Sequence, residues 1–65
     1  MDAEDIGRRL AHLRTEHRDL DAAIVALASM PQPDQLQVAR LKRRKLAIKD
    51  EIAMLGDQLI PDIIA

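Results

Sequence analysis

The sequence predicts an all-α fold: an antiparallel two-helix coiled-coil hairpin, which we expect to assemble into a helical bundle. Two segments carry hydrophobic residues at alternating steps of three and four, the spacing of a helix packed against a partner helix. Between them lies Ser-Met-Pro-Gln-Pro-Asp, whose two prolines no helix would run through. No segment alternates with the period of two that a half-buried strand requires.

Capping residues and prolines set the expected boundaries of a single domain over residues 1–65. Asp2 is a good N-cap for a first helix over about 3–29, and Pro31 stops that helix in a turn over about 30–34. Asp34 is the N-cap of a second helix over about 35–60. Pro61 ends that helix and leaves a short tail over 61–65.

The two hydrophobic seams mirror each other across the turn. The first consists of Ile6, Leu10, Leu13, His17, Leu20, Ile24 and Leu27, and the second of Val38, Leu41, Lys45, Ile48, Ile52, Leu55 and Leu59. Antiparallel pairing in which paired residue numbers sum to 65 gives every seam residue a seam partner. The same register places Asp21 near Lys42, which is favourable, but Arg14 near Lys49, which is unfavourable. We therefore expect the apolar layers, and not the flanking charges, to set the register.

Composition excludes several kinds of protein. Hydrophobic residues make up 48% of the chain, yet it has no aromatic residue, so its core must be aliphatic. The absence of cysteine excludes disulfides, thiolate nucleophiles and cysteine-based zinc sites. The acidic start lacks the pattern of a signal peptide, and no apolar run is long enough to span a membrane. We expect a cytoplasmic protein.

Two seam positions, His17 and Lys45, are polar and lie within one layer of each other. The simpler interpretation is that Lys45 extends its ammonium group to water while His17 fixes the register. A second interpretation makes His17 a pH-responsive element, because histidine titrates near neutral pH. A metal site is disfavoured because His12 and His17 are five residues apart, not the four that place two histidines on one helix face.

The second segment also contains a basic run. Its exposed members are expected to be Arg40, Lys42, Arg43, Arg44 and Lys49. One interpretation is a solvated face paired with neighbouring acids such as Glu16, Asp19 and Asp21. The other is a nucleic-acid surface that neutralises phosphates. The net charge of −1 and the lack of aromatic residues for base stacking favour the first interpretation.

A second apolar stripe on the same segment points away from the seam. The residues that we expect to mediate self-association are Leu36, Leu46, Ala53, Ile60, Ile63 and Ile64. Large aliphatic residues outside a closed seam are typical of an interface, and small scaffolds without disulfides or metals commonly need association for stability. We therefore expect a homo-oligomer, either a dimer or a tetramer.

Three stretches of the sequence are distinctive: Glu-His-Arg-Asp-Leu-Asp at 16–21, Arg-Leu-Lys-Arg-Arg-Lys-Leu-Ala-Ile-Lys-Asp-Glu-Ile at 40–52, and the ending Leu-Ile-Pro-Asp-Ile-Ile-Ala. In these stretches the chain resembles the YdcH-like family of small bacterial proteins, which is catalogued as a domain of unknown function. The resemblance implies a short coiled-coil hairpin and leaves the biochemical role open.

The expected function is that of a non-enzymatic interaction module of unknown cellular role. The sequence has no nucleophile beside a plausible base and no glycine-rich loop for phosphate, so we expect neither catalysis nor a cofactor. The module is expected to self-associate and to present a basic, partly apolar surface to a protein partner. The alternative is a small nucleic-acid-associated protein that uses the basic run. Membrane binding is not expected, because the amphipathic helices already have each other as partners.

Overall fold

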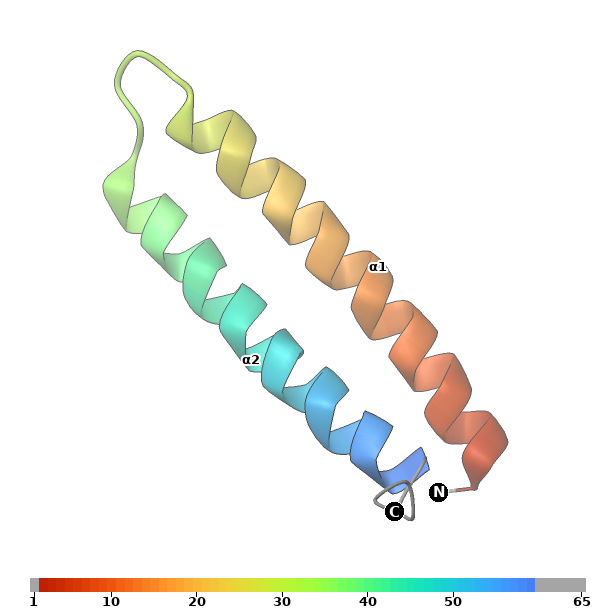
Figure 1. Ribbon diagram of the computed structural model, residues 1–65. Helices are drawn as coiled ribbons and strands as arrows, with labels where there is room; N and C mark the ends of the chain where they lie inside the picture. Colours follow the sequence, from red (N-terminus) through yellow and green to blue (C-terminus); the bar gives the residue numbers. More distant parts are fainter. Residues whose placement is uncertain (1, 60–65) are drawn as a thin grey trace.

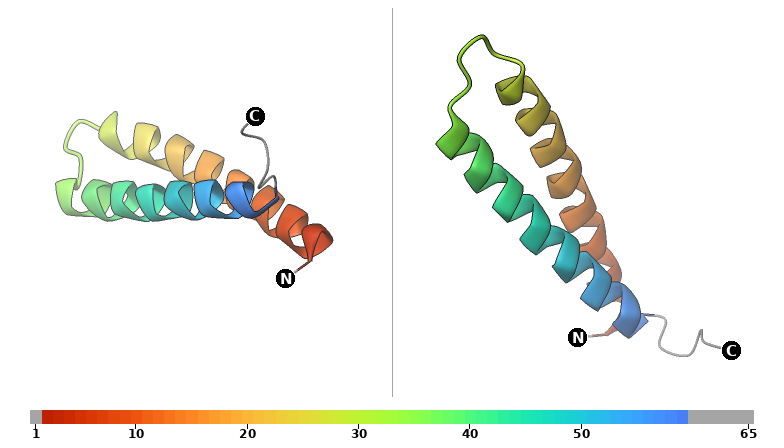
Figure 2. Two further views of the ribbon diagram at one scale, coloured as in Figure 1. Left: turned by 60° about the horizontal axis from the view of Figure 1, so that its bottom comes forward. Right: turned by 60° about the vertical axis from the view of Figure 1, so that its left-hand side comes forward.

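The computed structural model describes residues 2–59 and shows two antiparallel α-helices packed side by side. Helix α1 spans Ala3–Ala28 and helix α2 spans Gln35–Leu59, and a loop over 29–34 joins them at one end of the molecule (Figure 1). Figure 2 shows the same pairing from two further directions. The predicted all-α helical hairpin is confirmed, and its assembly into a bundle stays a prediction.

The helix ends follow from the predicted capping residues. The Asp2 side chain accepts a hydrogen bond from the backbone N–H of Asp5 at 2.9 Å, which satisfies one of the free donors of the first turn of α1. Asp34 does the same for α2, since its Oδ1 accepts from the N–H groups of Leu36 and Gln37 at 3.1 Å. Helix α1 ends one residue before the predicted boundary. The tail over 61–65 lies outside the described residues.

The core consists of seam residues alone. Among the described residues, the buried side chains are those of Ile6, Leu10, Leu13, Ile24, Val38, Ile48 and Leu55. All the other seam residues with described side chains, including His17 and Lys45, are half-buried. The heptad pattern therefore identified every buried residue among those described. Leu59 belongs to α2, but its side chain lies outside the described part.

Two ion pairs join the helices along one edge of the hairpin. Arg9 contacts Glu51, and Arg44 contacts Glu16, each with an N–O distance of 2.9 Å. From the first pair to the second, α1 advances by seven residues and α2 retreats by seven, so the antiparallel register is constant between them. We call these four residues the paired edge. The expectation that the apolar layers, and not the flanking charges, set the register stays a prediction.

Candidate interaction surface

The outer face of α2, turned away from α1, keeps large apolar side chains in contact with solvent. Leu36, Leu46 and Met54 are 63%, 58% and 57% exposed, and Ala39 and Ala53 are exposed as well. Large aliphatic groups outside a complete seam are typical of an interface. Of the predicted self-association residues, the structure thus places three on this face. The others, Ile60, Ile63 and Ile64, lie outside the described residues.

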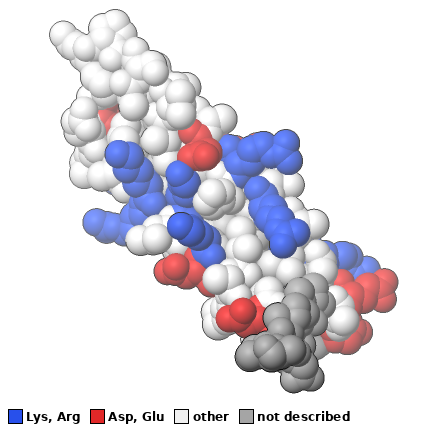
Figure 3. All heavy atoms as spheres, in the orientation of Figure 1, with Lys and Arg blue, Asp and Glu red and all other residues white. Residues whose placement is uncertain are grey.

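The turn end of the hairpin is apolar and almost uncharged. Residues 22–39 contain a single charged residue, Asp34, and Figure 3 shows this end of the molecule largely free of coloured side chains. Val25 and Met30 are 64% and 52% exposed there. Sequence reasoning missed Met30 because it lies in the turn, outside any helical period. The lack of charge over 22–39 is the signal that identifies this end.

The edge opposite the paired edge is rich in lysine. Lys42, Lys45 and Lys49 lie along it, and we call these three residues the lysine edge. The Lys45 ammonium contacts the Asp21 carboxylate at 2.5 Å. The predicted partner of Asp21 was Lys42, so the pairing differs from the prediction by one helical turn. The hydrogen bond from Lys45, together with its positive charge, lowers the pKa of Asp21. Within residues 2–59, Lys42 and Lys49 have no carboxylate within 4 Å.

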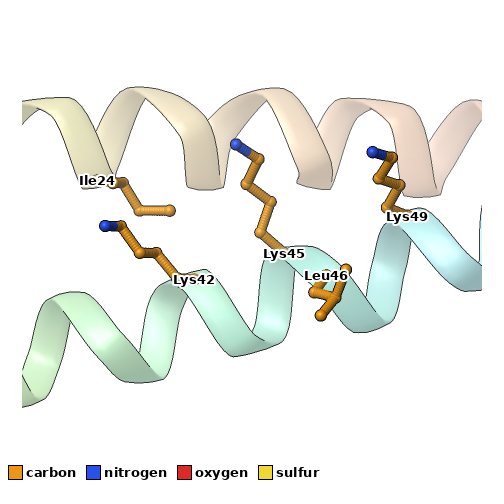
Figure 4. Close-up of a pocket in the computed structure, with 5 residues that line it drawn as sticks. All are labelled: Ile24, Lys42, Lys45, Leu46 and Lys49. Atoms are coloured by element: carbon orange, nitrogen blue, oxygen red, sulfur yellow. The ribbon is translucent and has the colours of Figure 1, made fainter.

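An open groove of about 310 Å³ lies along the lysine edge. It is lined by the three lysines together with Ile24 of α1 and Leu46 of α2 (Figure 4). Figure 4 shows the amino groups of Lys45 and Lys49 directed toward α1, with Leu46 between the two lysines along the helix. The groove therefore combines aliphatic surface with a row of ammonium groups. We call it the lysine groove.

A second open groove of about 480 Å³ lies on α1 and is lined by Arg18, Asp21, Ala22, Val25 and Ala26.

The basic run does not form one continuous surface. Arg44 lies at the paired edge and is bound to Glu16. Lys42 and Lys49 line the lysine groove, whereas Arg40 and Arg43 are exposed elsewhere on α2. Figure 3 shows Lys and Arg side chains gathered over the middle of one face of the hairpin. The helical twist thus divides the five predicted basic residues among three sides.

The two polar seam residues have different surroundings. Lys45 is half-buried, and its ammonium group contacts the Asp21 carboxylate. That its stem lies along the seam stays a prediction. His17 is half-buried on α1, and its pH-responsive role stays a prediction. His12 instead contacts Glu16 at 3.3 Å.

Residues 2–59 contain no group of three or more His, Cys, Asp or Glu side chains placed to hold a metal ion. Neither of the described helices has the length and apolar character needed to cross a bilayer.

The family described as Protein of unknown function (DUF465) matches residues 10–55. The chain belongs to this family. DUF465 is the YdcH-like family that the sequence resembles, and its match includes the turn, the lysine groove and all of the paired edge except Arg9. No curated protein and no solved structure matches the chain. Membership in DUF465 thus agrees with the helical hairpin and assigns no biochemical role.

Proposed function

We propose that this DUF465 protein is a non-enzymatic helical interaction module that self-associates through the outer face of α2. The exposure of Leu36, Leu46 and Met54 carries the proposal, because each is more than half exposed although the seam between the helices is complete. Covering such side chains stabilises an assembly by roughly 25 cal/mol per Å² of apolar surface removed from water.

The charges of the outer face suit a second copy of the same helix. Arg43 and Asp50 are exposed and lie seven residues apart, so they share one side of α2 about 10 Å from each other. An antiparallel two-fold arrangement centred near Leu46 and Ala47 places Arg43 of each copy opposite Asp50 of the other. A two-fold interface forms every contact twice, so two ion pairs would flank the central leucines.

Charge reversal tests both the association and its antiparallel arrangement. We expect Arg43→Asp or Asp50→Arg alone to weaken association roughly 10-fold, because each creates two like-charge contacts. The double variant R43D/D50R should restore association, and so should an equimolar mixture of the two single variants. Sedimentation velocity at micromolar concentrations measures each case. A monodisperse wild-type monomer would contradict self-association. If the wild type associates and the charge reversals do not change its association, the antiparallel two-fold arrangement is wrong.

The proposal includes no catalytic step. The grooves on the described part of the hairpin are open, and the charged residues that line them lie at the edges of the helix pair. Catalytic groups usually act in a site that excludes water, where electrostatic interactions are stronger.

A nucleic-acid-associated protein is the second candidate. In its favour, Arg40, Lys42, Arg43 and Lys49 are exposed and have no carboxylate within 4 Å among residues 2–59. Titration with a generic duplex and with RNA at low and moderate salt tests it. Submicromolar binding at moderate salt, abolished by reversing the charges of Arg43 and Arg44, would support this candidate.

A further inference from the structure

The two edges of the hairpin differ in charge balance. On the paired edge, two arginines are matched by two glutamates. On the lysine edge, within residues 2–59, only Lys45 of the three lysines contacts a carboxylate, that of Asp21. Ammonium groups that lie along one side of a helix repel each other, so the excess contributes nothing to the stability of the hairpin. This excess therefore indicates a role for the lysine edge outside the fold itself.

The lysine groove supplies apolar surface between the excess cations. Ile24 is only 8% exposed and closes the groove toward the seam, whereas Leu46 is 58% exposed at its rim. Lys42 and Lys49 lie seven residues apart on α2, a separation of about 10 Å along the helix axis. A ligand that fills this site must carry apolar groups between negative charges spaced by about two helical turns.

We propose that the lysine groove binds an acidic amphipathic helix of a protein partner. A helix with carboxylates seven residues apart would place one beside Lys42 and the other beside Lys49. Its leucine-sized side chains, at the i+3 and i+4 positions between them, would lie on Leu46 and Ile24. This inference rests on the proposed role of the chain as an interaction module and names the partner for one of its surfaces.

Other occupants fit the groove less well. A second copy docked groove to groove would bring two rows of lysines together, which is electrostatically unfavourable. Nucleic acid would satisfy the ammonium groups, but the groove offers no aromatic ring for base stacking and would leave Ile24 and Leu46 without apolar contacts. An acidic helix uses both the charges and the aliphatic surface.

The test uses a synthetic helical peptide of about 18 residues, long enough to have helical character alone. The peptide is built from Leu, Glu and Ala with leucines and glutamates on one face, and its control has the same composition shuffled over all faces. Fluorescence anisotropy with the full chain at moderate salt should show micromolar binding of the amphipathic peptide and at least 10-fold weaker binding of the control.

Two matched variants locate the binding site. Lys42→Glu and Arg40→Glu make the same charge change at exposed positions two residues apart, but only Lys42 lines the groove. We expect Lys42→Glu to weaken binding at least 10-fold and Arg40→Glu to weaken it less than 3-fold. A peptide with lysine in place of glutamate should bind the variant K42E/K49E and not the wild type. Circular dichroism confirms that each variant keeps its helices.

The alternatives give distinct outcomes. Equal losses in the two variants, or equal binding of the shuffled peptide, would overturn the proposal. So would tighter binding to single-stranded RNA or to anionic phosphatidylserine vesicles than to the amphipathic peptide. Because Leu46 belongs to both surfaces, peptide binding is measured at a protein concentration at which the chain is monomeric, and a monomer that does not bind the peptide contradicts only the groove proposal. A chain that binds the peptide but is still monomeric at micromolar concentrations contradicts only the proposed self-association.

Discussion

Truncating one leucine in the seam and one on the outer face should separate the forces that fold the hairpin from those that assemble it. Leu13 is 1% exposed and lies in the core cluster with Ile48, whereas Leu46 is 58% exposed. Leu13→Ala leaves a cavity in a packed core, for which the loss is about 2–5 kcal/mol. A chain of this size has a total stability of roughly 3–10 kcal/mol. Leu13→Ala should therefore remove a large part of the folding free energy.

Thermal melts followed by circular dichroism measure the difference. At about 4–8 °C per kcal/mol for a small domain, Leu13→Ala should lower the melting temperature by roughly 10 °C or more at every protein concentration. Leu46→Ala makes the same chemical change in a largely exposed side chain. It should instead reduce the rise of melting temperature with protein concentration that self-association produces. A Leu13→Ala variant as stable as the wild type would refute the assignment of the core.

Two further predictions concern the glycines and the Asp21 carboxylate. A Cβ at Gly7 or Gly56 would meet no heavy atom within 4 Å. Gly7→Ala and Gly56→Ala should therefore each stabilise the helices by about 0.5–1 kcal/mol. A lower melting temperature for either variant would contradict this expectation. Lys45 lowers the pKa of Asp21 in the folded state. Their pairing therefore stabilises the hairpin at pH values above the ordinary aspartate pKa of about 3.9, and this stabilisation is lost as the pH falls below that value. The stability difference between the wild type and Asp21→Asn should therefore shrink between neutral pH and about pH 3, and a difference that does not change with pH would contradict the pairing.

The fold was predictable from sequence because it depends on short aliphatic side chains and on capping groups. A leucine or isoleucine in a heptad seam reaches only the helix directly opposite, so its position along the chain determines its contacts. The caps are equally local, since Asp2 and Asp34 bond to backbone groups two or three residues away. These features require no knowledge of how distant side chains are oriented.

The charged edges were harder to predict because long side chains choose among several partners. Lys45 occupies a seam position, yet its flexible stem carries the ammonium group to Asp21, which the register alone assigned to Lys42. Of the paired edge, Glu16 was expected to pair with the basic run that contains Arg44, whereas the Arg9–Glu51 pair was missed. Its signal was present, because acid and base alternate every seven residues, as in Arg9 followed by Glu16. The function of the exposed surfaces is not encoded in the seam at all, since the seam specifies only the partner helix.

The charge pattern of the paired edge also opposes misaligned hairpins. Exposed ion pairs such as Arg9–Glu51 and Arg44–Glu16 are each worth only about 0.2–1 kcal/mol. A slip of one heptad in one direction places Glu16 against Glu51, and a slip in the other direction places Arg9 against Arg44. Both slips keep apolar residues in the seam, although they leave some layers unpaired, so the like-charge contacts add to the preference for the native register.

The ion pair between Lys45 and Asp21 also favours the native register, but this role does not account for the other two lysines of the lysine edge. Asp21 faces Lys45 only in the native register, and either heptad slip separates the two. One lysine is sufficient for that purpose, because a second or third ammonium group on the same edge distinguishes no further register. Lys42 and Lys49 are exposed and make no ion pair within residues 2–59. The acidic helix proposed above would supply negative charge to both lysines beside Leu46.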